Sequence, residues 1–293
     1  MHQQTGWRHG HCCDAWLGLG ILKTRHFCMR SSAVAPKPRP RLRYTPMYRH
    51  PTVIAIGGGG FTHQADPAME DFIIAASGCP RPRIGFIGTA SDDDPVKIAR
   101  FYERFTPLAE HLTHLGVGST AAATAQWAEG LDIVYVGGGH TLRLIKHWRD
   151  TGIAQVLIAA AQRGVLMAGV SAGANVWFEQ ALSDSGGQGL QPVTGIGLVA
   201  GSCCPHYDSE AQRPPAYTAA IASAVLSPGV AIDDGVALLI DGAGQMTAFS
   251  ARSGASAYRV TREAHSGKAA SASIQAHTAF TAGTERAPGR LSK

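Results

Sequence analysis

The sequence predicts an α/β protein in which a doubly wound, mostly parallel β-sheet lies between two layers of helices. Short apolar runs, which are typical of buried strands, alternate along the chain with segments of helical composition. Several of these runs end in glycine-rich turns, as at residues 57–60 and 137–139. Repeated strand-then-helix units imply parallel strands joined by crossovers, so the working edge of the sheet is expected at the strand C-termini.

The strands are predicted from continuous apolar runs, many of them rich in β-branched residues. The dipeptides Asp234-Gly235 and Asp241-Gly242 indicate tight turns between the last three of them. The predicted strands cover residues 52–56, 83–88, 113–117, 131–136, 165–168, 195–199, 230–233, 236–240 and 246–250.

The helices are predicted from their capping residues. Pro67 suits the first position of a helix, with Asp66 before it as the cap. Asp94 and Pro95 begin the next helix in the same way, so the three aspartates at residues 92–94 indicate a helix start rather than a metal site. The predicted helices cover residues 67–77, 96–105, 121–129, 142–149, 154–163, 172–182 and 215–225.

One domain with a tail at each end accounts for 293 residues with a hydrophobic content of 45%. Residues 1–50 hold nine lysines and arginines against one aspartate, a net charge of +8. The whole chain carries +5, so the remainder carries −3. We expect residues 1–48 to be a disordered basic leader, or the product of a start codon assigned too early. The domain is expected at residues 49–262 and a second disordered segment at residues 263–293.

These features exclude several classes of protein and site. Because the positive charge belongs to the leader, a nucleic-acid-binding function loses its main support. No apolar run approaches the roughly 18–20 residues of a membrane span, and residues 15–22 are too short and glycine-rich for a secretion signal. The six cysteines form no C-x-x-C pair, which favours reduced thiols in a cytoplasmic protein. The glycines at residues 57–60 lack the G-x-G-x-x-G spacing of a nucleotide site.

The segment around Ser171 predicts the reactive centre. Residues 169–173 read Gly-Val-Ser-Ala-Gly and fit the G-x-S-x-G nucleophile elbow between a strand and a helix. The glycines permit a turn where a Cβ atom would clash. The serine oxygen is then exposed beside a helix N-terminus, whose N–H groups favour developing negative charge. On this motif alone, a structural turn with an idle serine remains the alternative.

A serine nucleophile needs a base, and the base needs an acid to hold its tautomer. Asp184 and His206 follow Ser171 in the order found in α/β-hydrolases. In that fold the acid and the histidine come from much later strands, so the short spacing argues against it. The other acids nearby are Glu179, Asp208 and Glu210.

Taken together, the motifs resemble the dipeptidase E/cyanophycinase family of serine peptidases. The matching segments are residues 136–141, 169–175, the Ser183-Asp184 pair, and residues 205–207 with Arg213. The resemblance covers roughly residues 51–260 and is greatest to a less characterised branch with an Asp-Asp-Gly before the last strands. It implies the fold of the class I glutamine amidotransferases, a flavodoxin-like, three-layer α/β/α arrangement.

The resemblance also implies roles at the matching positions. Ser171 would be the nucleophile, His206 the general base, and Asp184 the acid that orients the histidine. The implied oxyanion donors are the backbone N–H groups of Gly138 or Gly139 and of Ala172.

Three further side chains are implied near the substrate, each with an alternative. His140 stands where family members usually have asparagine, so it either contacts the substrate or only caps a helix. Arg213 either binds a substrate carboxylate with two hydrogen bonds or forms an ion pair on the surface. Asn175 either touches the substrate or secures the elbow.

The sequence thus predicts a serine hydrolase that cleaves small peptides through an acyl-enzyme, with no cofactor and no metal. The resemblance implies aspartyl dipeptides or isopeptides as substrates. A catalytically inactive, amidotransferase-like binding module is the alternative, kept open by His140 and by the choice between several acids. A homo-oligomer is also left open.

Overall fold

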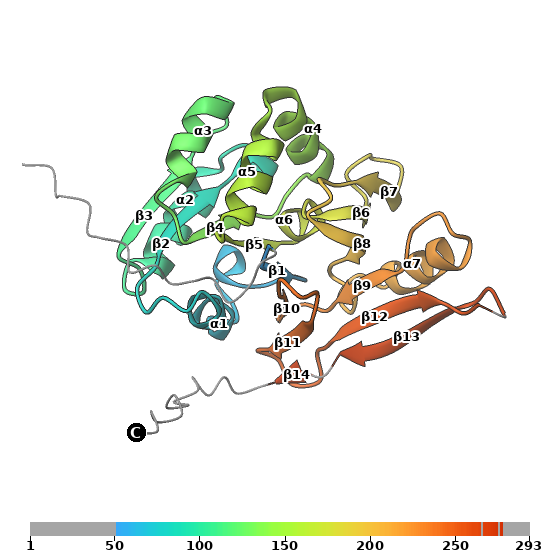
Figure 1. Ribbon diagram of the computed structural model, residues 1–293. Helices are drawn as coiled ribbons and strands as arrows, with labels where there is room; N and C mark the ends of the chain where they lie inside the picture. The colour runs from blue at the N-terminus through green and yellow to red at the C-terminus, as the bar shows by residue number, and fades with distance from the viewer. Residues whose placement is uncertain (1–50, 265, 275, 278–293) are drawn as a thin grey trace, which may run out of the picture. The chain divides into compact units, whose positions relative to one another are not determined.

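The computed structural model describes residues 51–264, 266–274 and 276–277, all within one compact unit of the chain, Thr45–Lys293. The leader expected at residues 1–48 lies outside the described residues. Two β-sheets and a set of helices make up the described part of the chain (Figure 1). The α/β class predicted from the sequence is confirmed, and the second sheet is an addition to it.

The larger sheet consists of β1 (Val53–Ile56), β2 (Arg83–Ile87), β3 (His111–Leu115), β4 (Ile133–Val136), β5 (Leu166–Val170), β10 (Val236–Ile240), β11 (Met246–Ser250) and β14 (Ala276–His277). The strand order is β14-β11-β10-β1-β5-β4-β2-β3. The five strands from β1 to β3 in this order are parallel, whereas β10 is antiparallel to both β1 and β11, and β11 is parallel to β14. The register sets Ile56 of β1 opposite Val170 of β5, so both strands end at the same edge.

Helices cover both faces of this sheet. On one face α1 (Ala68–Ala76) and α2 (Pro95–Phe105) pack against alternate residues of β1, β2 and β4. On the other face lie α3 (Ala121–Ala128), α4 (Thr141–Thr151) and α5 (Ile153–Gln162). Successive residues of a strand point to opposite faces, so the central strands contribute to both cores and are apolar throughout. This is the three-layer arrangement that the sequence predicts.

The smaller sheet consists of β6 (Phe178–Ser183), β7 (Gln191–Thr194), β8 (Val199–Cys204), β9 (Gly229–Ile232), β12 (Ala257–Arg262) and β13 (Ala269–Ile274). Its strand order is β13-β12-β9-β8-β6-β7, and β8 is parallel to both β6 and β9. Helix α7 (Arg213–Ala222) packs on this sheet through Tyr217 and Ile221. Because β9 leads directly into β10, the two sheets are joined by a short connection at residues 233–235.

The helix predicted at residues 172–182 is wrong over most of its length. Helix α6 covers only Ala172–Asn175, and β6 begins three residues later. Phe178 and Leu182 of β6 are buried, and Ala181 pairs with a residue of β8. Alanine and leucine favour a helix locally, but pairing with β8 and burial of these side chains outweigh that preference.

The disordered segment expected from residue 263 onward also needs correction. β13 pairs with β12 along its whole length, with Ile274 opposite Ala257, and β14 pairs with β11. The alanine and serine of β13 carry little hydrophobic signal, so only the backbone pairing reveals the strand. Residues 278–293 lie outside the described chain.

The predicted helix starts have different outcomes. The side chain of Asp94 accepts the Val96 N–H at 2.9 Å, so the predicted cap of α2 is confirmed. Asp66 does not cap α1, because its carboxylate binds the guanidinium of Arg252, with Nη2 2.7 Å from Oδ2. A charge-assisted, bidentate contact of this kind is stronger than a capping bond.

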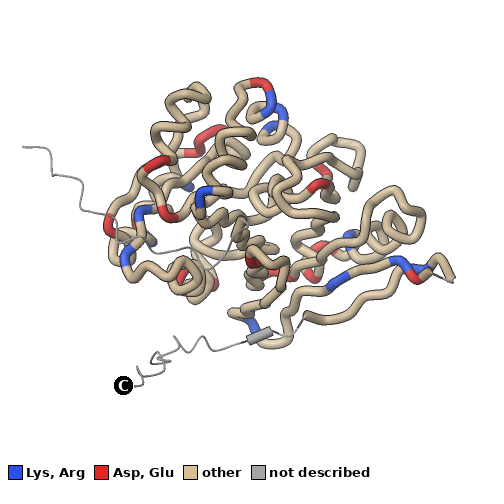
Figure 2. The backbone as a smooth tube through the Cα atoms, in the orientation of Figure 1, with Lys and Arg blue, Asp and Glu red and all other residues tan. Residues whose placement is uncertain are grey.

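Charged residues of both signs are interspersed along the described chain, as Figure 2 shows. None of the described helices is both long enough and apolar enough to span a bilayer.

Candidate active site

Ser171 occupies the turn between β5 and α6. Its φ of 56° and ψ of −114° are values that residues with a side chain adopt only under strain. A Cβ atom on Gly169 would lie 2.1 Å from the oxygen of Gly173, and one on Gly173 would lie 2.2 Å from the oxygen of Val136. Both positions therefore require glycine, for the steric reason that the G-x-S-x-G pattern predicts.

Hydrogen bonds hold this turn against β1. The Ser171 N–H donates to the Ile56 carbonyl at 3.0 Å, and the Ser171 carbonyl accepts from the Asn175 N–H at 2.9 Å. The hydroxyl of Ser171 makes no hydrogen bond within the described chain. The serine is therefore fixed through its backbone, and its side chain is left for another partner.

Three backbone N–H groups near the serine have no acceptor in the described part of the chain: those of Gly138, Gly139 and Ala172. A Cβ atom on Gly138 would lie 3.2 Å from the Cβ of Ser171 and 3.8 Å from its Oγ, so this loop passes close to the hydroxyl. Gly139 has a φ of 151°, and a Cβ there would lie 2.3 Å from the Ala90 oxygen. Free N–H groups beside a hydroxyl form the kind of arrangement that binds an oxyanion.

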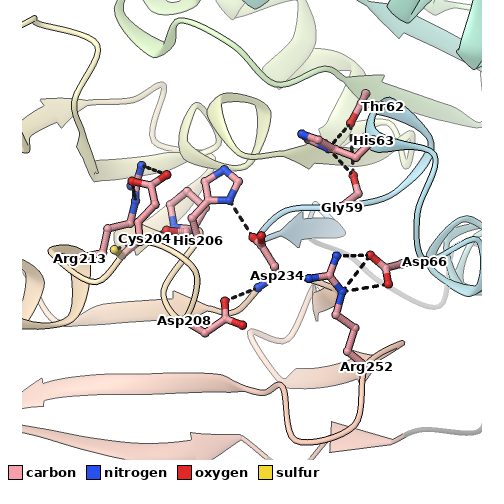
Figure 3. A network of polar contacts seen from close by, with 12 residues as sticks. Gly59, Thr62, His63, Asp66, Cys204, His206, Asp208, Arg213, Asp234 and Arg252 are labelled. Atoms are coloured by element: carbon pink, nitrogen blue, oxygen red, sulfur yellow. Dashed lines mark hydrogen bonds and ion pairs between the residues drawn. The ribbon is translucent and has the colours of Figure 1, made fainter.

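His206 and Asp234 form a hydrogen-bonded pair, with 2.7 Å between Nδ1 and Oδ1 (Figure 3). Their side chains are only 17% and 19% exposed. The two residues follow β8 and β9, which are parallel neighbours with Cys204 opposite Ala231, so both side chains arise at the same edge of the smaller sheet. The peptide N–H of Asp234 donates to the Asp208 carboxylate at 2.8 Å, which steadies the acid from the other side.

The charge state of Asp234 suits a partner of histidine. Burial by itself would raise the pKa of Asp234, but the hydrogen bond and charge of His206 bring that pKa below its usual value. An ionised carboxylate only accepts hydrogen bonds, so Nδ1 of His206 carries the proton. The other ring nitrogen, Nε2, is then free to accept a proton.

Gly58 brings the pair to the edge where the serine lies. It follows β1 by two residues and forms a bridge with Asp234. A Cβ atom on Gly58 would lie 2.1 Å from Oδ1 of Asp234 and 2.7 Å from Cε1 of His206. The end of β1 therefore contacts the serine turn through Ile56 and the histidine pair through Gly58, so the larger and the smaller sheet supply one site.

The structure does not bring Asp184 to the histidine. Asp184 is exposed in the turn after β6, where its carbonyl accepts the Gly187 N–H. The three other acids weighed from the sequence are also engaged elsewhere. Glu179 accepts the Gly201 N–H, Glu210 binds Arg213, and Asp208 holds the backbone of Asp234.

Asp234 is the residue that sequence reasoning missed at this site. The sequence indicated it only as the first residue of a turn before Gly235. The signal available was the Asp-Asp-Gly run before the last strands, which the resemblance included without a role. Asp234 lies 28 residues after His206, and only the parallel pairing of β8 with β9 shows that the two meet.

The three side chains implied near the substrate have structural contacts of their own. His140 is exposed and accepts the Arg143 N–H on Nδ1 at 3.1 Å, so it caps α4. Arg213 is 4% exposed and its Nε donates to Glu210 at 2.8 Å, whereas the Glu210 side chain is 32% exposed, so the ion pair is partly buried. Asn175 is 2% exposed and lies behind the elbow, with its Oδ1 unpaired in the described chain.

Cys204 lies close to the histidine in sequence but is not a competing nucleophile. Burial raises the pKa of its thiol to about 12, with Arg213 only partly opposing that effect. A thiol with such a pKa is almost entirely protonated at neutral pH, and the thiolate is the reactive form.

Comparison with known proteins identifies the family. Residues 53–247 match the model of peptidase family S51. The chain is 40% identical over 215 residues, 73% of its length, to the uncharacterised peptidase YgaJ of Bacillus subtilis, of which it covers 93%. A shorter match, 41% over 70 residues, relates 24% of this chain to 29% of peptidase E from Citrobacter koseri.

Solved structures show the same fold. A peptidase from an acI-B1 actinobacterium superposes with a TM-score of 0.61 and 16% identity, over 79% of this chain and 97% of that one. A peptidase E-type protein from Listeria monocytogenes EGD-e gives a TM-score of 0.52 and 17% identity, over 68% of this chain and 97% of that one. With the family model, the relatives and the fold in agreement, the chain belongs to peptidase family S51, the peptidase E-like serine peptidases.

Proposed function

We propose that this peptidase cleaves small peptides through an acyl-enzyme on Ser171, with His206 as the general base and Asp234 as the acid. The observation that carries the proposal is the 2.7 Å hydrogen bond between His206 and Asp234, at the edge where the strained serine turn lies. A serine hydrolase triad consists of a hydroxyl, an imidazole and a carboxylate, and here the imidazole and the carboxylate are hydrogen-bonded to each other. Membership of the family supports a peptide bond as the target.

In the first half of the reaction, Nε2 of His206 takes the proton of the Ser171 hydroxyl while Oγ attacks the scissile carbonyl carbon. The carbonyl oxygen becomes negative and accepts hydrogen bonds from Ala172 N–H and from Gly138 or Gly139 N–H. Each such donor contributes about 3–4 kcal/mol in the transition state. The ionised Asp234 stabilises the imidazolium that forms.

In the second half, the imidazolium gives its proton to the leaving amine, and the C–N bond breaks to leave the acyl-enzyme. His206 then takes a proton from water, which attacks the ester carbonyl. When the C–O bond to Ser171 breaks, the proton returns to Oγ and the free acid leaves. The protons balance over the cycle, and this sequence of steps uses no cofactor.

Aspartyl dipeptides and isopeptides are the substrate class that we propose, from the resemblance to peptidase E. The arginines near the site already hold carboxylates, Arg213 that of Glu210 and Arg252 that of Asp66. An acidic substrate side chain would therefore displace one of these two carboxylates, or bind backbone donors or a cation that holds no carboxylate. A panel of dipeptides with N-terminal Asp, isoaspartyl, Asn and Leu, ranked by kcat/KM, distinguishes the possibilities.

A fluorophosphonate probe tests the nucleophile directly. We expect peptide mapping of the labelled full chain to locate the probe on Ser171, and we expect no label and no dipeptide turnover in Ser171→Ala. If the folded wild-type protein neither takes the label nor hydrolyses any member of the panel, the proposal is wrong. The chain would then be the inactive binding module.

We also propose a cytoplasmic location. The described cysteines, Cys79, Cys203 and Cys204, are free thiols, which suits a reducing compartment. Cell fractionation with a tagged full chain tests this location. Association of copies stays a prediction from the sequence, to be measured by size-exclusion chromatography with light scattering.

A further inference from the structure

A lysine amine contacts the loop that lies against the serine. Lys97, in the first turn of α2, donates from Nζ to the carbonyl oxygen of Gly138 at 3.0 Å. The side chain is half-buried, and among the described residues it forms no ion pair with a carboxylate. Lysines are almost never fully buried unless they are paired with an acid, and the partner of this half-buried amine is a peptide carbonyl. Its charge is directed at a peptide group instead.

The peptide group that Lys97 holds also contains one of the free N–H groups. The Gly138 carbonyl and the Gly139 N–H belong to the same planar trans unit, so they point in opposite directions. A bond that fixes the direction of the carbonyl therefore fixes the direction of the N–H as well. The Gly139 N–H has no acceptor in the described chain, and its peptide begins at Gly138, which lies against Ser171.

This loop needs an anchor at its centre. At one end the Gly137 N–H donates to Ile87 at 3.0 Å, and at the other the His140 N–H donates to Ala90 at 2.8 Å. Between them lie two glycines, which have more backbone freedom than any other residue. Among the described residues, the hydrogen bond from Lys97 is the one that holds the Gly138–Gly139 peptide, which lies between these two anchored ends of the loop.

We propose that Lys97 is a positioning residue that aims the Gly139 N–H at the oxyanion. The ammonium group also polarises the peptide through its carbonyl oxygen, and a polarised peptide is a stronger N–H donor. In this role Lys97 acts through the peptide and not on the reacting atoms, so its contribution appears when negative charge develops on the substrate oxygen. The inference rests on the proposed role of Ser171 and goes further by naming what supports the oxyanion site.

The test compares Lys97→Met, which keeps most of the stem but removes the charge, with Lys97→Arg, which keeps a cationic donor. Lys146→Met is the matched control, because Lys146 is an exposed lysine on α4 that pairs with Asp150. Circular dichroism and thermal unfolding establish that each full-length variant is folded. The measurements are the fluorophosphonate labelling rate of Ser171, kcat and KM on the best dipeptide, and the affinity for the corresponding peptide aldehyde.

We expect Lys97→Met to lower kcat and the labelling rate about 10- to 100-fold, less than the roughly 10²–10³-fold loss when an oxyanion donor is deleted. KM should stay within a factor of about three, since ground-state binding does not use the oxyanion contact. The aldehyde, which forms a tetrahedral adduct with serine, should bind more weakly by the same factor as kcat falls. Lys97→Arg should recover most of the activity, and Lys146→Met should match the wild type.

The outcomes separate this inference from the proposed function. If the wild type neither takes the label nor turns over, the proposed function fails before any variant is compared. If the wild type is active and Lys97→Met labels at the wild-type rate, only the role of Lys97 is wrong. A rise in KM confined to acidic substrates, with kcat unchanged, would also overturn it, because Lys97 would then bind the substrate carboxylate. If Lys97→Met does not fold, Lys97→Gln replaces it as the variant without the charge. The proposed role of Lys97 is then overturned if folded Lys97→Arg is no more active than Lys97→Gln.

Discussion

Replacing Asp234 by asparagine removes the negative charge of the proposed acid and keeps the size and shape of its side chain. The carboxylate accepts the Nδ1 proton of His206 at 2.7 Å and leaves Nε2 to act as the base. An asparagine amide can donate to Nδ1 instead, which moves the proton to Nε2 and removes the lone pair that the serine proton needs. The variant also loses the negative charge that stabilises the imidazolium.

The size of the effect follows from how well the pair is shielded. In a fully buried Ser-His-Asp triad this change lowers kcat about 10⁴-fold. Here the acid is 19% exposed, so water partly screens its charge. We therefore expect a loss of about 10³-fold in kcat, equivalent to about 4 kcal/mol of activation free energy. KM should change little, because the pair acts on the transition state.

Asp184→Asn provides the matched control, since Asp184 is the exposed acid implied by the resemblance. Both variants are assayed on the same dipeptide, together with fluorophosphonate labelling of Ser171, and we expect Asp184→Asn to stay within about threefold of the wild type in both. The reasoning is refuted if Asp184→Asn abolishes turnover while Asp234→Asn, folded by circular dichroism, keeps it.

Two further predictions concern Gly58, which lies beside the His206–Asp234 pair, and the buried Glu70 of α1. In Gly58→Ala the new methyl would lie 2.1 Å from Oδ1 of Asp234, and displacing a catalytic group by about 1 Å costs on the order of 10²-fold in kcat. Gly118→Ala, where a Cβ meets nothing within 4 Å, is the control, and equal kcat values for the two variants would contradict the packing argument. Burial raises the pKa of Glu70 from 4.5 to about 7, against the opposing effects of the Phe61 N–H and Arg104. The folded state therefore binds this proton more tightly than the unfolded chain, so stability falls by roughly 3 kcal/mol as pH rises from about 4.5 to about 7. Glu70→Gln should remove this pH-dependent part of the free energy of unfolding. Urea unfolding of both proteins at pH 5 and pH 7.5 measures it. If the variant keeps the pH dependence of the wild type, Glu70 is not the source of that dependence.

Much of the larger sheet could be predicted because its strands are continuous apolar runs, which are recognisable from a few consecutive residues. β11 has the bounds 246–250 that the apolar run and the preceding turn indicate, and β10 likewise covers residues 236–240. β6 and β13 could not be found in this way, since one has a helical composition and the other is largely alanine and serine. Both are strands because a partner strand lies beside them, and that partner is distant in sequence.

The sequence by itself determined the serine turn. Gly169 and Gly173 permit two backbone segments to approach where a side chain would clash, and this steric requirement is visible in five consecutive residues. The tertiary structure decided which carboxylate meets His206. The strand that leads to His206, β8, lies between β6 and β9. Asp184 follows β6 and Asp234 follows β9, so the chain offers an acid on either side of the histidine. The imidazole contacts the acid on the β9 side, beside Gly58, because the connection from β9 to β10 carries that acid to the larger sheet. Strand order is a property of long-range pairing, which no local pattern encodes.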